Sequence, residues 1–107
     1  MAKILIIEDD AAIAAIEQDY LEIENFETEI AADGKTGLSR GLSGEFDLIL
    51  LDLMLPGMDG FAVCRKLREK INIPILMVTA RQEDIDKIRG LALARTIILK
   101  SPFPRAS

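Results

Sequence analysis

Acidic residues stand at the end of two strongly apolar runs in this chain. Asp52 follows four aliphatic residues, and Glu8, Asp9 and Asp10 follow another four. If the two runs are neighbouring parallel strands, their acidic ends meet at one edge of a sheet. Like charges at such short range are tolerated only with a bound cation, and Mg²⁺ prefers oxygen ligands. The pattern therefore predicts a magnesium site built around one nucleophilic aspartate, Asp52.

Each of these residues also has a purely structural interpretation. The acidic triplet could form a solvated turn in which Asp10 caps the next helix, and we keep that role for Asp10. Asp52 could simply form a turn, but no turn requires an acid directly after four aliphatic residues. Thr79 ends another apolar run, and a threonine in that place is by itself more often a strand residue than a phosphate ligand.

Composition limits the classes of protein to which the chain can belong. A length of 107 residues predicts one domain with a modest core, which we place at residues 1–107. The net charge of −5 repels nucleic acid and anionic membranes, so neither is expected as a direct partner. No apolar run is long enough for a membrane span or a secretory signal, which favours a cytoplasmic location. Histidine is absent, so imidazole catalysis is excluded, and Cys64 is expected to be a core thiol.

Short aliphatic runs alternate with amphipathic stretches, which is typical of βα units around a parallel sheet. We expect strands at residues 3–7, 26–31, 48–52, 75–79 and 96–99. Helices are expected after Asp10, from the Asp33-Gly34 turn to about Leu42, around 61–68 and over 83–90. The run 48–52 is the most apolar and should lie at the sheet centre, with 26–31 at an edge. The first helix should bury the residues that recur at helical spacing, namely Ile13, Ile16, Tyr20 and Ile23.

The order of the motifs resembles that of bacterial response-regulator receiver domains of the OmpR/PhoB type. An acidic cluster follows the first strand, Asp-x-x-x-Pro-Gly-x-Asp-Gly begins at Asp52 after the third, and Thr79-Ala80 ends the fourth. The resemblance covers residues 2 to about 90. It implies a flavodoxin-like α/β fold with a doubly wound parallel five-stranded sheet of order 2-1-3-4-5 and an active site at the carboxyl ends of the strands.

The same resemblance implies a role for each residue of the site. Asp52 is the expected phosphoacceptor, and a sensor histidine kinase is the expected partner that donates the phosphoryl group. The hydroxyl of Thr79 and the amide of Ala80 would hold the phosphoryl oxygens. The expected Mg²⁺ ligands are Glu8, Asp9, Asp52 and the backbone carbonyl of Met54. We therefore expect a phosphoacceptor module of a two-component signalling system, and not an enzyme.

The chain departs from the family pattern from about residue 91. The family's fifth strand reads approximately Gly-Ala-Asp-Asp-Tyr-Ile-x-Lys-Pro-Phe, whereas residues 94–103 read Ala-Arg-Thr-Ile-Ile-Leu-Lys-Ser-Pro-Phe. Codons chosen for a family-like segment, when read one nucleotide late, reproduce residues 91–107 without an error, which indicates a frameshift near Gly90. In the restored frame the family's lysine stands at the position of Ser101, and Lys100 is its neighbour on the other side of the strand.

This altered tail changes what we expect of the fold and of the function. The fifth strand should be altered, the last helix missing, and the family's aromatic switch residue replaced near Ile97 or Ile98. The uncovered surface around Ile97, Ile98 and Leu99 should drive self-association, most simply as a two-fold dimer. The alternative function is that of a truncated pseudo-receiver that acts only in interaction or oligomerisation. A Mg²⁺-dependent phosphohydrolase is disfavoured, because no general acid follows Asp52 at a two-residue spacing.

Overall fold

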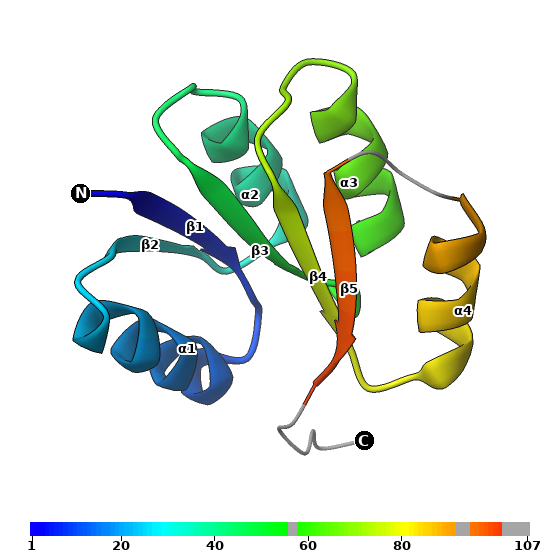
Figure 1. Cartoon of the computed structure of the whole chain (residues 1–107), viewed down its shortest axis with the longest axis horizontal. Coiled ribbons are helices and arrows are strands. Elements are labelled where there is room, and N and C mark those ends of the chain that lie inside the picture. The colour runs from blue at the N-terminus through cyan, green and yellow to red at the C-terminus, as the bar shows by residue number, and fades with distance from the viewer. Residues whose placement is uncertain (56–57, 92–94, 102–107) are drawn as a thin grey trace.

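The computed structural model describes residues 1–55, 58–91 and 95–101, in which five parallel strands form one sheet of order β2-β1-β3-β4-β5 (Figure 1). The strands are β1 (Lys3–Ile7), β2 (Glu27–Ala31), β3 (Leu48–Asp52), β4 (Ile75–Thr79) and β5 (Thr96–Lys100). The helices are α1 (Ala11–Ile23), α2 (Gly34–Gly41), α3 (Gly60–Arg68) and α4 (Gln82–Leu91). The predicted doubly wound α/β fold is confirmed. None of the helices in the described ranges is long and apolar enough to cross a membrane.

The position of each strand follows from its pattern of apolar residues. β3 lies at the centre of the sheet, as predicted, and its residues 49–52 are all buried. β2 lies at an edge, and its sequence alternates acidic and smaller or apolar residues. Residues 92–94 and 102–107, which carry part of the predicted altered tail, lie outside the described residues.

Aspartates cap the three helices that follow the first three strands of the sheet. The carboxylate of Asp10 accepts hydrogen bonds from the amides of Ala12 and Ile13 at 3.0 and 3.1 Å, so its predicted capping role is confirmed. Asp33 and Asp59 cap α2 and α3 in the same way. A capping side chain satisfies amides that have no partner within the helix, which fixes where each helix begins.

The register of the strands brings the two acidic strand ends together. Ile7 pairs with Leu51 across the β1–β3 ladder, so Glu8 and Asp52 are the next residues along each strand. On the far side of β3, Asp52 pairs with Val78 of β4. Neighbouring parallel strands lie about 4.8 Å apart, so side chains that follow them must share one small region at the edge of the sheet.

The two faces of the sheet are covered unequally. The larger core cluster joins the sheet to α2, α3 and α4, for example through Val63, Leu67 and Ile88. The smaller cluster holds Ile4, Ile6 and Leu50 with side chains such as Leu21 of α1. Among the described residues, α1 is therefore the only helix on its face, and it contacts β1 and β2 instead of β4 and β5.

The prediction that the apolar stripe of α1 is buried is wrong for three of its four residues. Ile13 is buried, but Ile16, Tyr20 and Ile23 are 39%, 66% and 74% exposed. The stripe is a valid helical pattern, yet no described element packs beside α1 to cover it. The expectation of an uncovered surface around Ile97, Ile98 and Leu99 is also wrong for one of the three. Ile98 is buried in the core, whereas Ile97 and Leu99 are exposed.

A close approach between α3 and the end of β3 makes a testable prediction at Gly60. A Cβ atom there would lie 2.6 Å from the Cα of Leu53 and 2.8 Å from the carbonyl oxygen of Asp52. Because both contacts are to backbone atoms, Gly60→Ala should destabilise the fold by about 1–3 kcal/mol in urea unfolding. Gly90→Ala is the control, because a Cβ there meets nothing within 4 Å and should be neutral or slightly stabilising. Equal stability of the two variants would contradict this packing.

Candidate functional site

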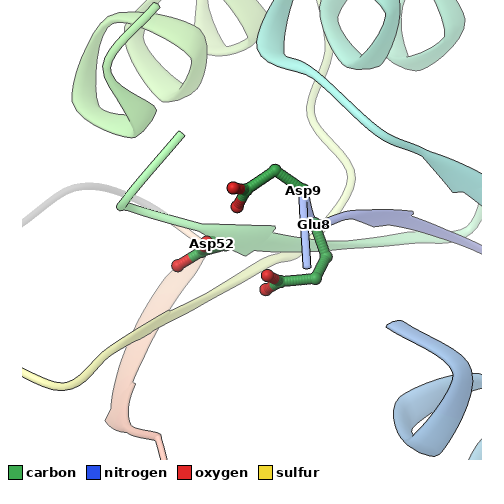
Figure 2. Close-up of side chains that lie close together, drawn as sticks. All are labelled: Glu8, Asp9 and Asp52. Atoms are coloured by element: carbon green, nitrogen blue, oxygen red, sulfur yellow. The ribbon is translucent and has the colours of Figure 1, made fainter. Parts of the chain in front are cut away.

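Three carboxylates converge where β1 and β3 end. One oxygen atom from each of Glu8, Asp9 and Asp52 can be chosen so that all three lie within 4.8 Å of one another. Glu8 and Asp52 are each only 2% exposed, whereas Asp9 is exposed. Figure 2 shows the three side chains gathered around one space beyond the ends of the two strands. The sequence predicted this grouping, and the structure brings the three residues together.

Local backbone hydrogen bonds hold the two buried carboxylates in place. One oxygen of Glu8 accepts a bond from the amide of Asp10 at 3.0 Å, which ties it to the start of α1. One oxygen of Asp52 accepts a bond from the amide of Met54 at 3.1 Å. Each of these bonds fixes the orientation of a carboxylate, so both side chains are held at this edge of the sheet.

The chemistry of this cluster fits a divalent cation with hard oxygen ligands. Two buried carboxylates and one exposed carboxylate within 4.8 Å repel one another strongly, and a bound cation relieves that repulsion. Mg²⁺ is commonly bound by one or two carboxylates and keeps several waters, which suits a site with one exposed ligand. Glu8, Asp9 and Asp52 can therefore hold Mg²⁺.

Two residues predicted to contribute backbone groups lie at the same edge. Met54 follows Asp52 by two residues and is 46% exposed. Its soft thioether does not suit Mg²⁺, so its backbone carbonyl is the group that could serve the site. Ala80 follows β4 and is exposed. The predicted roles of the Met54 carbonyl and the Ala80 amide stay predictions.

Thr79 ends β4 as a buried residue with two hydrogen-bond partners. Its hydroxyl donates to the carboxylate of Asp84 at 3.2 Å and accepts from the amide of Arg81 at 3.1 Å. To hold a phosphoryl oxygen, the hydroxyl must turn its proton away from Asp84. Sequence reasoning missed Asp84, and the available signal was its place in the first turn of the helix that follows Thr79.

The residues at the end of β5 alternate between the two faces of the sheet. Lys100 pairs with Thr79 and Leu99 pairs with Val78, which is itself the partner of Asp52. The amide of Ser101 donates to the carbonyl of Thr79 at 2.6 Å, so the strand pairing continues past Lys100. Since side chains alternate along a strand, Ser101 belongs to the face of Asp52, and Lys100 belongs to the opposite face.

Two other side chains, the guanidinium of Arg81 and the thiol of Cys64, could in principle do chemistry, but each has another role. The guanidinium of Arg81 donates to Glu83, and this contact raises the pKa of Arg81. Cys64 is buried in the core, and burial raises the pKa of its thiol. A protonated, buried thiol is a poor nucleophile, which agrees with its predicted role as a core residue.

Comparison with known sequences identifies one family over nearly the whole chain. The family model described as "Response regulator receiver domain" matches residues 4–106. The chain is 43% identical over 103 residues to the response regulator ArlR of Staphylococcus saprophyticus, a match that covers 96% of this chain and 47% of the relative. It is 42% identical over 101 residues to the transcriptional regulatory protein ResD of Bacillus subtilis, covering 94% and 42%. The chain thus spans about half the length of these relatives.

Solved structures give the same result. The receiver domain of the Francisella response regulator 1452 superposes with a TM-score of 0.85 and 31% identity, covering 97% of this chain and 87% of that chain. The response regulator TrrA of Thermotoga maritima, solved in complex with Mg²⁺-BeF, superposes with a TM-score of 0.84 and 29% identity, covering 95% and 89%.

These matches correct one prediction made from the sequence. We expected the chain not to be an enzyme, but receiver domains have autophosphorylation and phosphatase-like activity of their own. The physical reason is that clustered carboxylates can align an acceptor oxygen and hold a cation whose charge would offset that of the phosphoryl group. Lowering the barrier in this way is catalysis even when the phosphoryl group ends up on the protein.

Proposed function

This chain belongs to the response regulator receiver domain family, and from that premise we propose that Asp52 accepts a phosphoryl group from a histidine kinase. The observation that carries the proposal is the burial of Asp52 beside Glu8 and Asp9, at the ends of neighbouring strands. Incubation with acetyl phosphate and Mg²⁺, read by intact mass, tests whether the chain takes up one phosphoryl group.

In the proposed transfer, the chain's own residues position the acceptor and receive the product. An Asp52 carboxylate oxygen forms a bond to phosphorus as the bond from phosphorus to the kinase's histidine nitrogen breaks. The leaving histidine takes one proton from solvent and ends as a neutral imidazole. The amide of Met54 holds Asp52 in place from one side. The Thr79 hydroxyl is proposed to leave Asp84 and donate to a phosphoryl oxygen, with the amide of Ala80 beside it. Glu8 and Asp9 would hold the cation.

We propose Mg²⁺ as the cofactor, held by Glu8, Asp9, Asp52 and the Met54 carbonyl. When bound, Mg²⁺ would neutralise the charge on the phosphoryl oxygens and help to align the in-line displacement. The donor chemistry of the three carboxylates supports this choice, and TrrA, with 29% identity, was solved with Mg²⁺-BeF.

Metal binding should appear as a gain in thermal stability. A ligand at 100 times its Kd stabilises the folded state by about 2.7 kcal/mol, so millimolar Mg²⁺ should raise the unfolding midpoint of the wild type by several degrees. Asp9→Ala should abolish that rise, because Asp9 is one of three clustered ligands. Asp47→Ala is the control, since Asp47 precedes β3 at its opposite end and should leave the rise intact. If added Mg²⁺ does not change the thermal unfolding midpoint of the wild type, the acidic cluster binds no metal.

A second candidate function is that of a pseudo-receiver that serves only in interaction or oligomerisation. One observation favours it: Ser101, which is not a cation, belongs to the sheet face of Asp52 where the family places a lysine. A site without that cation would transfer phosphate slowly, and the protein would then act through its surfaces.

The partner of the first function is a sensor histidine kinase, and family membership also supports a cytoplasmic location. We propose in addition that copies of the chain self-associate through the face that carries the exposed residues of β5 and α1. The chain spans about half the length of these relatives, one of which, ResD, is named a transcriptional regulatory protein.

We further propose that residues 1–107 form a single receiver domain whose tail, from about residue 91, arises from a frameshift. The reading of residues 91–107 as a shifted family segment supports this origin. Sequencing the DNA around the codon for Gly90 decides it: the shifted frame should encode a family-like fifth strand with a lysine directly before a proline.

A further inference from the structure

The hydroxyl of Thr79 has a single proton, and in this structure that proton is directed toward α4. Thr79 directly follows Val78, the strand partner of Asp52. Its hydroxyl donates to the Oδ2 atom of Asp84 at 3.2 Å and accepts from the amide of Arg81 at 3.1 Å. A carboxylate accepts hydrogen bonds and does not donate them, so the direction of the bond to Asp84 is fixed. The donor that the site needs is therefore already in use.

The packing of α4 holds Asp84 beside this hydroxyl. Asp84 lies in the first turn of α4, and the next residue, Ile85, is buried in the larger core cluster. The side chain of Asp84 is itself only 16% exposed. The Nε atom of Arg81 lies 4.0 Å from the same carboxylate oxygen, at the outer limit of an ion pair, and donates to Glu83. If Thr79 turns away, Asp84 loses a hydrogen bond that its surroundings replace poorly.

An acid in the first turn of a helix also has a purely structural role. Negative charge near a helix N-terminus stabilises the helix, and Glu83 in the same turn supplies it from a side chain that is 68% exposed. That role requires neither burial nor a bond to a neighbouring strand. The contact between Asp84 and Thr79 is therefore more than the stability of α4 requires.

We propose that Asp84 is a positioning residue that restrains the Thr79 hydroxyl and so slows phosphoryl uptake at Asp52. As the phosphoryl group arrives, the hydroxyl turns about its own C–O bond, leaves Asp84 and donates to a phosphoryl oxygen. The proton stays on the Thr79 oxygen throughout, so only hydrogen bonds change. This inference rests on the function proposed above for Asp52 and Thr79, and it adds a residue that sets the rate.

Asp84→Ala should raise the rate of phosphoryl uptake from acetyl phosphate and Mg²⁺ by about 3- to 10-fold. This is the effect of releasing one hydrogen bond of ordinary strength, and 3.2 Å is long for a bond from a hydroxyl. Asp86→Ala is the matched control on the same helix. Asp86 is exposed and accepts from the side chain of Gln82, so this variant should keep the wild-type rate. Circular dichroism verifies that both variants fold.

A double-mutant cycle with Thr79→Val separates the hydrogen bond from the charge of Asp84. Asp84→Ala also removes a negative charge near an anionic phosphoryl donor, which by itself favours uptake. Thr79→Val has no hydroxyl to release, so Asp84→Ala should lose most of its effect in that background. If Thr79→Val does not fold, Thr79→Ala takes its place in the cycle. An equal gain in both backgrounds would refute the proposal, because Asp84 would then act through its charge alone.

Beryllofluoride, a mimic of the phosphoryl group, gives a second measurement in which no bond to phosphorus forms. With Mg²⁺ and beryllofluoride, the thermal unfolding midpoint of Asp84→Ala should rise more than that of the wild type, and Thr79→Val should remove this difference. If Asp84→Ala matches the wild type in both uptake rate and midpoint rise, Asp84 has no such role, while the acceptor role of Asp52 stands. A wild type that takes up no phosphoryl group and shows no midpoint rise would overturn the proposed function as well.

Discussion

Asp52→Asn should abolish phosphoryl uptake, whereas the wild type should gain one phosphoryl group from acetyl phosphate and Mg²⁺. The substitution keeps the size of the side chain and replaces the charged oxygen nucleophile with a neutral amide, which is a very poor acceptor at this site. Because Asp52 is buried beside Glu8 and Asp9, removal of one negative charge should not harm folding. Intact mass spectrometry of both proteins measures the outcome.

Asp59→Asn provides the matched control for this experiment. Asp59 undergoes the same chemical change, but its carboxylate caps α3 through the amide of Phe61 at 2.7 Å, and asparagine caps helices as well as aspartate does. This variant should take up phosphate like the wild type. A phosphoryl adduct that persists in Asp52→Asn would refute the assignment of the acceptor, and no adduct in any of the proteins would favour the pseudo-receiver.

Ser101→Lys should increase the rate of phosphoryl uptake, on the order of 10²-fold, which is the usual effect of one preorganised group that stabilises charge in a transition state. The expectation follows from strand alternation. Ser101 belongs to the face of the sheet that carries Asp52, so a lysine there can reach toward the phosphoryl group. The added cation should also lower the Mg²⁺ dependence of folding stability, since it shares in neutralising the carboxylates.

Lys100→Ala tests the alternative, in which Lys100 supplies the positive charge of the site. Lys100 pairs with Thr79 on the other face of the sheet, so its removal should leave the uptake rate nearly unchanged. The measurement is the rate of phosphorylation with acetyl phosphate for the wild type and the two variants. If Lys100→Ala loses activity and Ser101→Lys gains none, Lys100 is the cation of the site, and the account of the altered tail is wrong.

The strands and their acidic ends could be predicted from sequence because they depend on local patterns, whereas the sheet order was implied by the resemblance to receiver domains. Four aliphatic residues that end in an acid indicate both a buried strand and a polar group at its carboxyl end. Once β1 and β3 are neighbours, the parallel register brings Glu8 and Asp52 together. The cap at Asp10 was predictable for the same reason, since capping depends on residues a few positions apart.

Features that depend on distant packing could not be predicted. The helical stripe of α1 indicates which residues align, but not whether another element covers Tyr20 and Ile23. Local sequence also gives no sign that Gly37 of α2 packs closely against β1, where a Cβ would lie 2.7 Å from the side chain of Ile7. The bond between the Thr79 hydroxyl and Asp84 likewise depends on how α4 docks after β4.

The most direct test of the proposed function is to locate the phosphoryl group on the wild-type chain. After incubation with acetyl phosphate and Mg²⁺, borohydride reduces an aspartyl phosphate to the corresponding alcohol, and peptide mass mapping finds the altered residue. We expect a single modified position, Asp52, and we expect it only when Mg²⁺ is present. Modification at another aspartate, or modification of Asp52 that is indifferent to Mg²⁺, would contradict a phosphoacceptor site built from Glu8, Asp9 and Asp52.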